Sequence, residues 1–331
     1  MRLKLAIGVV AALGFSTAAM AQSDWKPSKP IEFNGAAGPG GGTDIFARNV
    51  QAIIQKYNLV DQPILVANKG GGSGAETFVY VRAATGDGHK LAFGTSNLYM
   101  LPMVAKVAFK YADFTPVAAM VFDEFILWNK GDSPNNDYKS YTQAAKEANG
   151  AMRMAGALSK DMDQLLTRYI EKDSGAKFIY IPYKSGGEAS VQLSGGHANS
   201  HVNNPSESVG HWRAGQVKAL CVFSKERLPK GPKVTATQAW SDIPTCKEQG
   251  SGIEEFRMPR TVALPPGVPP AAVTFWAGVF KKVSETPEWQ EYLDKTSQTG
   301  RYMAGNELKA FIEDDEKRAR KVFEEEGWLV N

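Results

Sequence analysis

Short apolar runs alternate with amphipathic segments along most of the chain, and this alternation limits the folds open to it. The apolar runs have strand length and are rich in β-branched or aromatic residues, as in PIEFNGA, PILVAN, KLAFGTSN, KFIYIPY and VKALCVF. The segments between them, such as DIFARNVQAIIQKY, place apolar residues along one side of a helix. Strands that alternate with helices predict an α/β fold of mostly parallel sheets flanked by helices.

The chain is long enough for two such domains. It has 331 residues, and a single hydrophobic core rarely grows beyond about 250–300 residues. The segment FTPVAAMVFDEFILWNK contains two strands and could pass from one domain to the other. We expect a first domain of residues 22–120 with 255–331 and a second of residues 121–254, with crossings near residues 117–122 and 253–261. Three further helices are expected around residues 273–285, 287–296 and 307–327.

The first 21 residues have the pattern of a secretory signal peptide. Arg2 and Lys4 precede a short apolar stretch, and Ala19-Met20-Ala21 is an A-x-A cleavage signature. We expect cleavage after Ala21, export to the periplasm, and a mature protein without a membrane span. Removal of the two basic residues leaves 36 basic against 35 acidic side chains, so the mature chain offers little attraction for nucleic acid or anionic lipid.

The sequence contains two cysteines, Cys221 and Cys246. In an exported chain they can persist as a disulfide, which we expect here, although two buried thiols would also satisfy the sequence. A pair of cysteines is too small a set of ligands for a metal site.

The ends of the predicted strands are the places where a sheet of this type binds ligands. The corresponding loops are rich in Gly, Ser, Thr and Asn, and poor in acids that would repel an anion, with Asp44 as an exception that could cap the following helix. These loops are residues 38–44, 68–74, 95–97, 156–161, 183–187 and 202–205.

Nucleotide-binding motifs are nearly present but incomplete. In the segment that starts at Gly35, Gly41 stands where a Walker A loop requires its lysine. The segment GGGSGA from Gly70 matches a dinucleotide fingerprint, but the next strand ends in Thr95, Ser96 and Asn97, without the acid that would hold a ribose. We therefore expect no nucleotide cofactor.

Catalytic motifs are weaker still. The sequence has no G-x-S-x-G elbow, and His197 and His201 lie four apart in a strand-like segment without the glutamate of an H-E-x-x-H motif. We expect neither a metal nor enzymatic chemistry. Backbone N–H groups at helix starts, approached closely because glycine has no Cβ, can instead bind an oxyanion. A carboxylate fits these loops better than a phosphoanhydride.

An ordered series of motifs resembles the Bug-type, TctC-like periplasmic solute-binding proteins of tripartite tricarboxylate transporters. The series is KPIEF…GPGGGTDIFAR, VANKGGGSGAE, GDGHKLAFGTSN, DFTPVAAM, IPYKSGGEASVQLSGGHANS, HWRAGQVKAL and DIPTCKEQG, and it spans the mature chain. The resemblance implies a two-lobed Venus-flytrap fold that closes on an organic carboxylate, and delivery of that ligand to membrane permease subunits. It implies no cofactor, and we expect a monomer.

The resemblance also assigns ligand-binding residues by position. Two loops, residues 38–44 and the loop around residues 184–187, form the jaws of a carboxylate clamp, and the ends of further strands line the space between them. The assigned residues are Gly41, Gly42, Thr43, Asp44, Thr95, Ser96, Asn97, Ser159, Lys160, Gly186, Gly187, Asn203 and Asn204.

The segment of residues 157–164 departs from the sequence of many relatives and is similar to that of the tricarboxylate-binding branch of the family. Its Lys160 could hold a second or third carboxylate of a ligand; an exposed lysine without a ligand role is the alternative. Arg260 is a further candidate cation. The sequence does not distinguish a tricarboxylate from a dicarboxylate or an aromatic carboxylate. An exported enzyme acting on a carboxylated substrate and a binding protein that reports to a sensor remain alternative functions.

Overall fold

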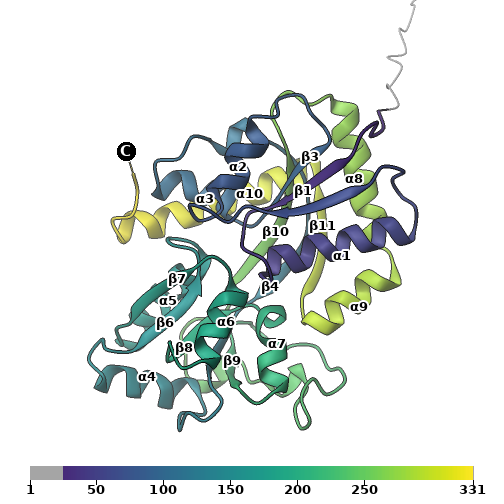
Figure 1. The fold of residues 1–331 in the computed structure, drawn as a ribbon. Coiled ribbons are helices and arrows are strands. Elements are labelled where there is room, and N and C mark those ends of the chain that lie inside the picture. Colours follow the sequence, from purple (N-terminus) through teal and green to yellow (C-terminus); the bar gives the residue numbers. More distant parts are fainter. Residues whose placement is uncertain (1–24, 331) are drawn as a thin grey trace, which may run out of the picture.

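The computed structural model describes residues 25–330, and the predicted signal peptide lies outside the described residues. Figure 1 shows two lobes, each a sheet flanked by helices, with strands β4 and β10 running between them. The first lobe contains a six-stranded sheet in the order β11-β4-β10-β3-β1-β2, and the second contains a five-stranded sheet in the order β7-β6-β8-β5-β9. The expected α/β fold of two lobes is therefore confirmed.

The first sheet is built from both ends of the described chain. Its strands are β1 (Ile31–Gly35), β2 (Ile64–Asn68), β3 (Lys90–Gly94), β4 (Thr115–Glu124), β10 (Arg257–Leu264) and β11 (Thr299–Ala304). Strands β1, β2 and β3 are parallel, whereas β10 runs antiparallel to β3 and β4, and β11 runs antiparallel to β4. Of these strands, β10 returns from the second lobe and β11 follows helices of the first lobe, so the first sheet is mixed. Strand β11 falls in a region where the sequence predicted only helices.

The second sheet lies entirely between the two crossings. Its strands are β5 (Ile126–Lys130), β6 (Arg153–Ala157), β7 (Ile179–Tyr183), β8 (Ser200–Asn203) and β9 (Val217–Val222). Strand β5 runs antiparallel to β8 and β9, while β6 is parallel to β7 and β8. A single residue, Phe125, separates the end of β4 from the start of β5, so the first crossing is a tight step from one sheet to the other.

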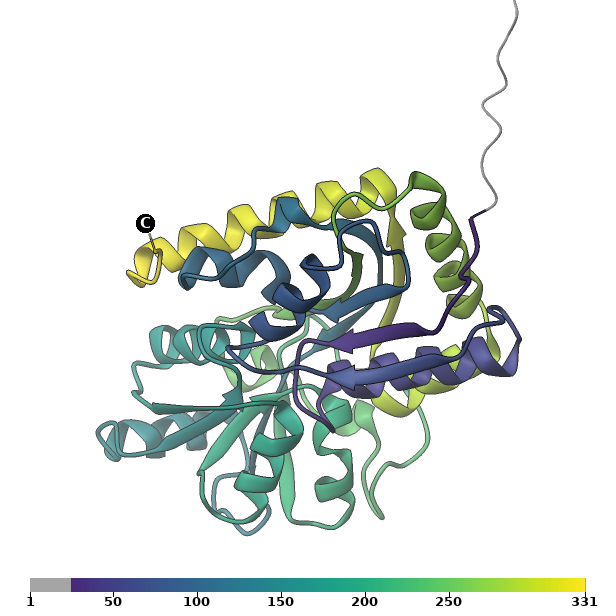
Figure 2. The ribbon, with the colours of Figure 1, turned by 45° about the horizontal axis from the view of Figure 1, so that its top comes forward.

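Helices cover the faces of both sheets, as Figure 2 shows from a second direction. The first lobe carries α1 (Gly42–Lys56), α2 (Ala75–Arg82), α3 (Asn97–Val104), α8 (Pro270–Ser284), α9 (Pro287–Thr296) and α10 (Gly305–Glu325). The second carries α4 (Tyr138–Glu147), α5 (Met162–Ser174), α6 (Gly186–Ser194) and α7 (Pro205–Arg213).

Apolar periodicity explains how a helix such as α1 is placed. Phe46, Val50, Ile53 and Ile54 recur at helical spacing, and all four are buried against the first sheet. This packing points the N-terminus of α1 toward the second lobe, next to the carboxyl end of β1.

A disulfide joins Cys221 at the end of β9 to Cys246 in the following connection, with a Cα–Cα distance of 4.9 Å. The predicted pairing is therefore confirmed. It ties the return path toward β10 to the edge of the second sheet, because Cys246 N–H also donates to the Val222 carbonyl.

Candidate functional site

A cleft lies between the lobes at the carboxyl ends of β1, β3, β6 and β8. It encloses about 30 Å³, a space of water size, so the two lobes are closed on each other. Loop residues and helix starts from both lobes contribute to it. The lining residues are Ala36, Ala37, Gly42, Thr43, Thr95, Asn97, Ala157, Leu158, Asp161, Asp163, Ser185, Gly186, Asn204, Glu207, Met258 and Arg260.

Backbone and hydroxyl groups hold the lobes together around the cleft. The N–H of Gly38 in the first lobe donates to the Lys184 carbonyl in the second, at 3.0 Å. On another side, the Ser159 N–H donates to Ser73 Oγ at 3.1 Å, and Ser73 Oγ lies 3.2 Å from the Ser159 carbonyl. These contacts bring the two predicted jaws, residues 38–44 and 184–187, face to face.

Close approach of the jaws depends on glycine. A Cβ on Gly187 would lie 2.5 Å from the carbonyl oxygen of Gly40 in the opposite lobe. A Cβ on Gly41 would lie 2.8 Å from the Cβ of Ser185. Since real Cβ atoms essentially never come within 3.0 Å of such atoms, neither position admits a side chain while the lobes are closed.

Helix α1 begins at the cleft, with Gly41 as its N-cap and no side-chain cap. Asp44 lies in the first turn, where its Oδ2 accepts from the Gly40 N–H at 3.0 Å and its Oδ1 pairs with Arg48 at 2.8 Å. The Gly42 N–H donates to Oε1 of Glu207, a residue of the second lobe. Carboxylates of the protein itself therefore already bind amides at this helix start, where the helix dipole favours negative charge.

Arg260 is the cation of the cleft. It lies on β10 with 1% of its surface exposed, and its guanidinium forms an ion pair with the buried Asp123 of β4. It also donates to Thr43 Oγ1 and to Asn204 Oδ1, each at 3.3 Å. The guanidinium thus links the crossing strands to α1 in one lobe and to α7 in the other.

Three carboxyl groups of the second lobe also line the cleft, contrary to the expectation that its loops are poor in acids. Asp161 is the N-cap of α5, Asp163 lies in the first turn of α5, and Glu207 lies in the first turn of α7. Burial raises the pKa of Asp161 to about 6 and that of Glu207 to about 7, and it holds the pKa of Asp163 well above its usual range. Asp161 belongs to the loop of residues 156–161, where a single acid was present in the sequence, whereas Asp163 and Glu207 lie within helices, beyond the loops considered.

The structure brings part of the predicted site together. The residues that line the cleft as predicted are Gly42, Thr43, Thr95, Asn97, Gly186 and Asn204. Others lie just behind this lining: Asn203 positions its neighbour by accepting from the Asn204 N–H at 2.8 Å, and Ser96 N-caps α3. Gly41, Gly187 and Ser159 lie at the contacts between the lobes. A direct role of any of these residues in ligand binding stays a prediction.

Lys160 does not line the cleft in the closed structure. Its Nζ donates to the Val104 carbonyl at the end of α3, at 3.2 Å, so it joins one lobe to the other. Its backbone is in the left-handed region, with φ of 53°, as is that of Leu158 with φ of 59°. The predicted contact with a distal carboxylate remains untested.

The glycine run from Gly70 serves the packing of neighbouring loops. A Cβ on Gly70 would lie 2.9 Å from the backbone of Ala37 and Gly38, and Gly74, with φ of 89°, approaches the Ala36 carbonyl. The glycines that make this run similar to a dinucleotide fingerprint are therefore explained by packing, because they let the run lie against the backbone of residues 36–38 in the first jaw.

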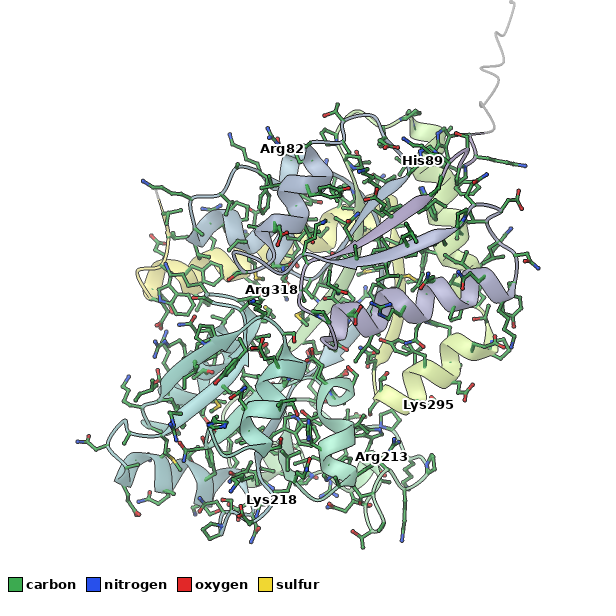
Figure 3. The ribbon with its side chains drawn as sticks, in the orientation of Figure 1. Arg82, His89, Arg213, Lys218, Lys295 and Arg318 are labelled. Atoms are coloured by element: carbon green, nitrogen blue, oxygen red, sulfur yellow. A yellow bond between two sulfur atoms is a disulfide. The ribbon has the colours of Figure 1, made fainter. Side chains whose placement is uncertain are left out.

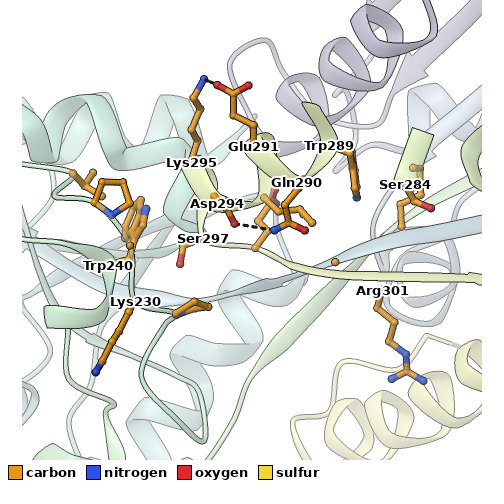
Figure 4. Close-up of a pocket in the computed structure, with 18 of the residues that line it drawn as sticks. Lys230, Trp240, Ser284, Trp289, Gln290, Glu291, Asp294, Lys295, Ser297 and Arg301 are labelled. Carbon is orange, nitrogen blue, oxygen red and sulfur yellow. Dashed lines mark hydrogen bonds and ion pairs between the residues drawn. The ribbon is translucent and has the colours of Figure 1, made fainter. Parts of the chain in front are cut away.

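A larger cavity than the cleft lies elsewhere in the described residues. It encloses about 780 Å³ between α9, β11 and the loop of residues 229–234, behind the crossing strands. Figure 4 shows its polar side chains, several of which bond to one another: Glu291 pairs with Lys295, and Gln290 donates to Asp294. It lies away from the carboxyl ends of the strands, where ligands bind in this type of fold.

Within the described part of the chain, no group of three or more His, Cys, Asp or Glu residues could hold a metal ion. Among residues 25–330, none of the helices combines the length and apolar character that crossing a membrane requires. Figure 3 shows labelled basic residues distributed over both lobes, with Arg82 and His89 on the first and Arg213 and Lys218 on the second.

Two α/β lobes, crossing strands and a closing cleft at the strand ends define a two-lobed solute-binding protein. The model of the tripartite tricarboxylate transporter family receptor, TctC, matches residues 46–328, and the chain belongs to this family. The family resemblance seen in the sequence is therefore confirmed.

Related sequences and structures agree with this assignment. The chain is 28% identical to the UPF0065 protein in gbd 5'region of Cupriavidus necator, over 96% of this chain and 94% of that protein. It is 27% identical to protein BugT of Bordetella pertussis, over 70% of this chain and 72% of that protein. The periplasmic binding protein BugD has the same fold, with a TM-score of 0.83 at 21% identity, and it covers 92% of this chain and 99% of its own. Membership of the TctC receptor family places the chain with solute-binding proteins rather than enzymes.

Proposed function

We propose that this protein captures a small organic carboxylate by closure of its two lobes and delivers it to the membrane permease subunits of a tripartite tricarboxylate transporter. The observation that carries the proposal is the cleft itself, where the start of α1, Thr43 and the Arg260 guanidinium face the second lobe. Amides at a helix start and a buried guanidinium are suited to a carboxylate. Family membership supports the transport role.

Solved structures of the same fold support the class of ligand. MatC from Rhodopseudomonas palustris is bound to malate, with a TM-score of 0.77 at 20% identity over 89% of this chain and 99% of its own. Rpa4515 of R. palustris binds adipate, with a TM-score of 0.81 at 21% identity over 90% of this chain and 97% of its own. By analogy, the ligand of this chain is an organic acid of similar size, and the lobes must part from the closed arrangement to admit it, because the closed cleft encloses only about 30 Å³.

Two bodies move relative to each other: residues 22–120 with 255–331 form one, and residues 121–254 form the other. The connections between β4 and β5 and between β9 and β10 are the hinges. Ligand binding shifts the equilibrium toward the closed form only through contacts that the closed form alone provides. The mature protein acts as a monomer in the periplasm after cleavage behind Ala21.

A thermal-shift screen of organic acids on the chain from residue 22 tests the proposal. A ligand that binds only the folded state stabilises it by about 2.7 kcal/mol at 100 times its Kd, so a binding acid raises the melting temperature. The neutral diamide of each active acid is the matched control and should give no shift. A panel in which no carboxylate exceeds its diamide would refute carboxylate binding, and turnover of a bound acid would identify an enzyme instead.

A further inference from the structure

The cavity beside α9 has walls from both lobes, and we call it the side groove. Arg213 of α7 and the loop of residues 229–234 belong to the second lobe, whereas α9, the end of α8 and β11 belong to the first. Figure 3 shows Arg213 and Lys295, from opposite lobes, on the same side of the molecule. Because its walls lie on the two bodies that move, the shape of this groove depends on whether the lobes are closed.

The two walls of the side groove differ in charge. The second-lobe wall carries three cations, Arg213, Lys230 and Lys233, and no acid. Within residues 25–330 none of these three pairs with an acid, whereas the nearby Arg227 pairs with Glu248 at 3.0 Å. The cations of the first-lobe wall are all paired. Those pairs are Lys281–Glu285, Lys295–Glu291 and Arg301–Glu307.

The loop that presents the unpaired lysines is held in place. Leu228 before it and Trp240 after it are buried in one core of the second lobe, where Trp240 packs on Trp212 with ring centroids 4.8 Å apart. The Arg213 Nε–H donates to the Val234 carbonyl at 3.0 Å, which ties the loop to the end of α7. An anchored loop loses less conformational entropy on binding a partner than a free one does.

The floor of the side groove is connected to the cation of the ligand cleft. Gln298 lines the groove and donates from Nε2 to the buried Asp123. Asp123 in turn forms the ion pair with Arg260, which donates to Thr43 in one lobe and to Asn204 in the other. One hydrogen bond and one ion pair therefore separate the groove from the residues that meet when the lobes close.

We propose that the side groove docks an acidic segment of a partner protein, and that it does so in the closed form. The acidic side chains of the segment pair with Arg213, Lys230 and Lys233. A compact polyanion matches the groove less well, because the acids of α8 and α9 lie on the opposite wall. An extended segment directs acids to one wall and uncharged side chains to the other, since successive side chains of a strand point to opposite sides.

Docking at this groove leaves the ligand cleft free. A partner bound there distinguishes the closed protein from the open one without competing with the ligand, because the groove and the cleft have no lining residue in common. This part of the inference rests on the proposed function, in which a bound acid closes the lobes. The charge of the second-lobe wall does not depend on it.

A labelled peptide tests the docking site. The probe is a fluorescein-labelled peptide of about ten residues in which glutamate alternates with serine, and the same peptide with glutamine in place of glutamate is the control. Fluorescence anisotropy on the chain from residue 22, at low salt and with the acid found in the screen, should give the glutamate peptide a Kd lower by about tenfold or more. Equal binding of the glutamine peptide overturns the inference.

Charge variants locate the binding. Lys230→Gln/Lys233→Gln removes two of the three unpaired cations and should raise the Kd of the glutamate peptide at least fivefold. Lys139→Gln/Lys146→Gln removes two exposed cations from α4 of the same lobe and is the matched control, with a change of less than twofold. Equal Kd values for the two double variants overturn the inference. Tripolyphosphate that displaces the peptide at equal concentration also overturns it, in favour of a site for small anions.

The last measurement concerns the closed form. Omission of the acid should raise the Kd of the glutamate peptide at least threefold, and saturating peptide should lower the Kd of the acid by the same factor. Peptide binding that is indifferent to the acid overturns recognition of the closed form and leaves carboxylate capture intact. If the screen finds no binding acid, the proposed function fails, whereas the two double variants measured without acid still decide whether the groove docks the peptide.

Discussion

The clash that a side chain at Gly187 would cause provides the sharpest test of lobe closure. Gly187 lies in the first turn of α6 in the second lobe, and a Cβ there would come within 2.5 Å of the Gly40 carbonyl oxygen in the first lobe. Ordinary van der Waals contact begins at about 3.4 Å, so the closed lobes must separate by about 1 Å to admit Gly187→Ala. The opposing atom is backbone and cannot rotate away.

The expected cost falls on closure and not on folding. Overpacking by one methyl group costs about 1–3 kcal/mol. If ligand binding requires closure, the affinity of the Gly187→Ala variant should fall by about 5- to 150-fold. The open second lobe gains from the change, because alanine is favoured over glycine within a helix by about 1 kcal/mol.

Gly210→Ala is the matched control for this experiment. Gly210 lies within α7 of the same lobe, and a Cβ there would meet no atom within 4 Å. Both variants should therefore keep or raise the melting temperature, while only Gly187→Ala weakens binding in titration calorimetry with the acid found in the screen. Small-angle scattering should show a larger radius of gyration for liganded Gly187→Ala. Wild-type affinity in a folded Gly187→Ala protein would refute the reasoning that the closed contact is required.

Three further predictions concern the disulfide, a buried carboxyl group at the end of β4, and the contact that Lys160 makes between the lobes. Removal of the disulfide in Cys221→Ser/Cys246→Ser opens a loop with a sequence separation of 25 and should lower the free energy of unfolding by about 3.5 kcal/mol in denaturant, and reductant should destabilise the wild type but not the variant. Glu124 accepts from Thr299 Oγ1 at 2.7 Å, and burial raises its pKa to about 7. The folded state then binds more protons than the unfolded state between about pH 4.5 and 7, so stability falls as pH rises through that window, by up to about 3 kcal/mol for this group. Glu124→Gln should flatten that slope, and an unchanged slope in denaturant titrations would exclude Glu124 as its source. Lys160→Ala removes the hydrogen bond to the Val104 carbonyl and should lower the affinity for all acids by the same factor in titration calorimetry. A loss of affinity confined to di- and tricarboxylates would instead favour a direct contact between Lys160 and the ligand.

The sequence by itself determined the class of fold. Apolar runs of strand length and helices with one apolar side, such as the Phe46, Val50 and Ile53 side of α1, predict alternating elements because burial depends on local periodicity. Glycines and small polar residues at strand ends predicted the jaws, since close backbone approach has a local signature. Cys221 and Cys246 could be paired because an exported chain with two cysteines offers a single disulfide.

The charge of the cleft was decided by the tertiary structure. Arg260 meets Asn204 across 56 residues and Thr43 across 217, and Glu207 meets the Gly42 amide across 165. No local pattern encodes such meetings, because they depend on the register of β10 against β4 and on the closure of one lobe against the other. Strand β11 was missed for a similar reason: its sequence, TGRYMA, has little strand character and becomes a strand through pairing with β4. Local chemistry therefore specified the jaws, and packing specified which side chains face the space between them.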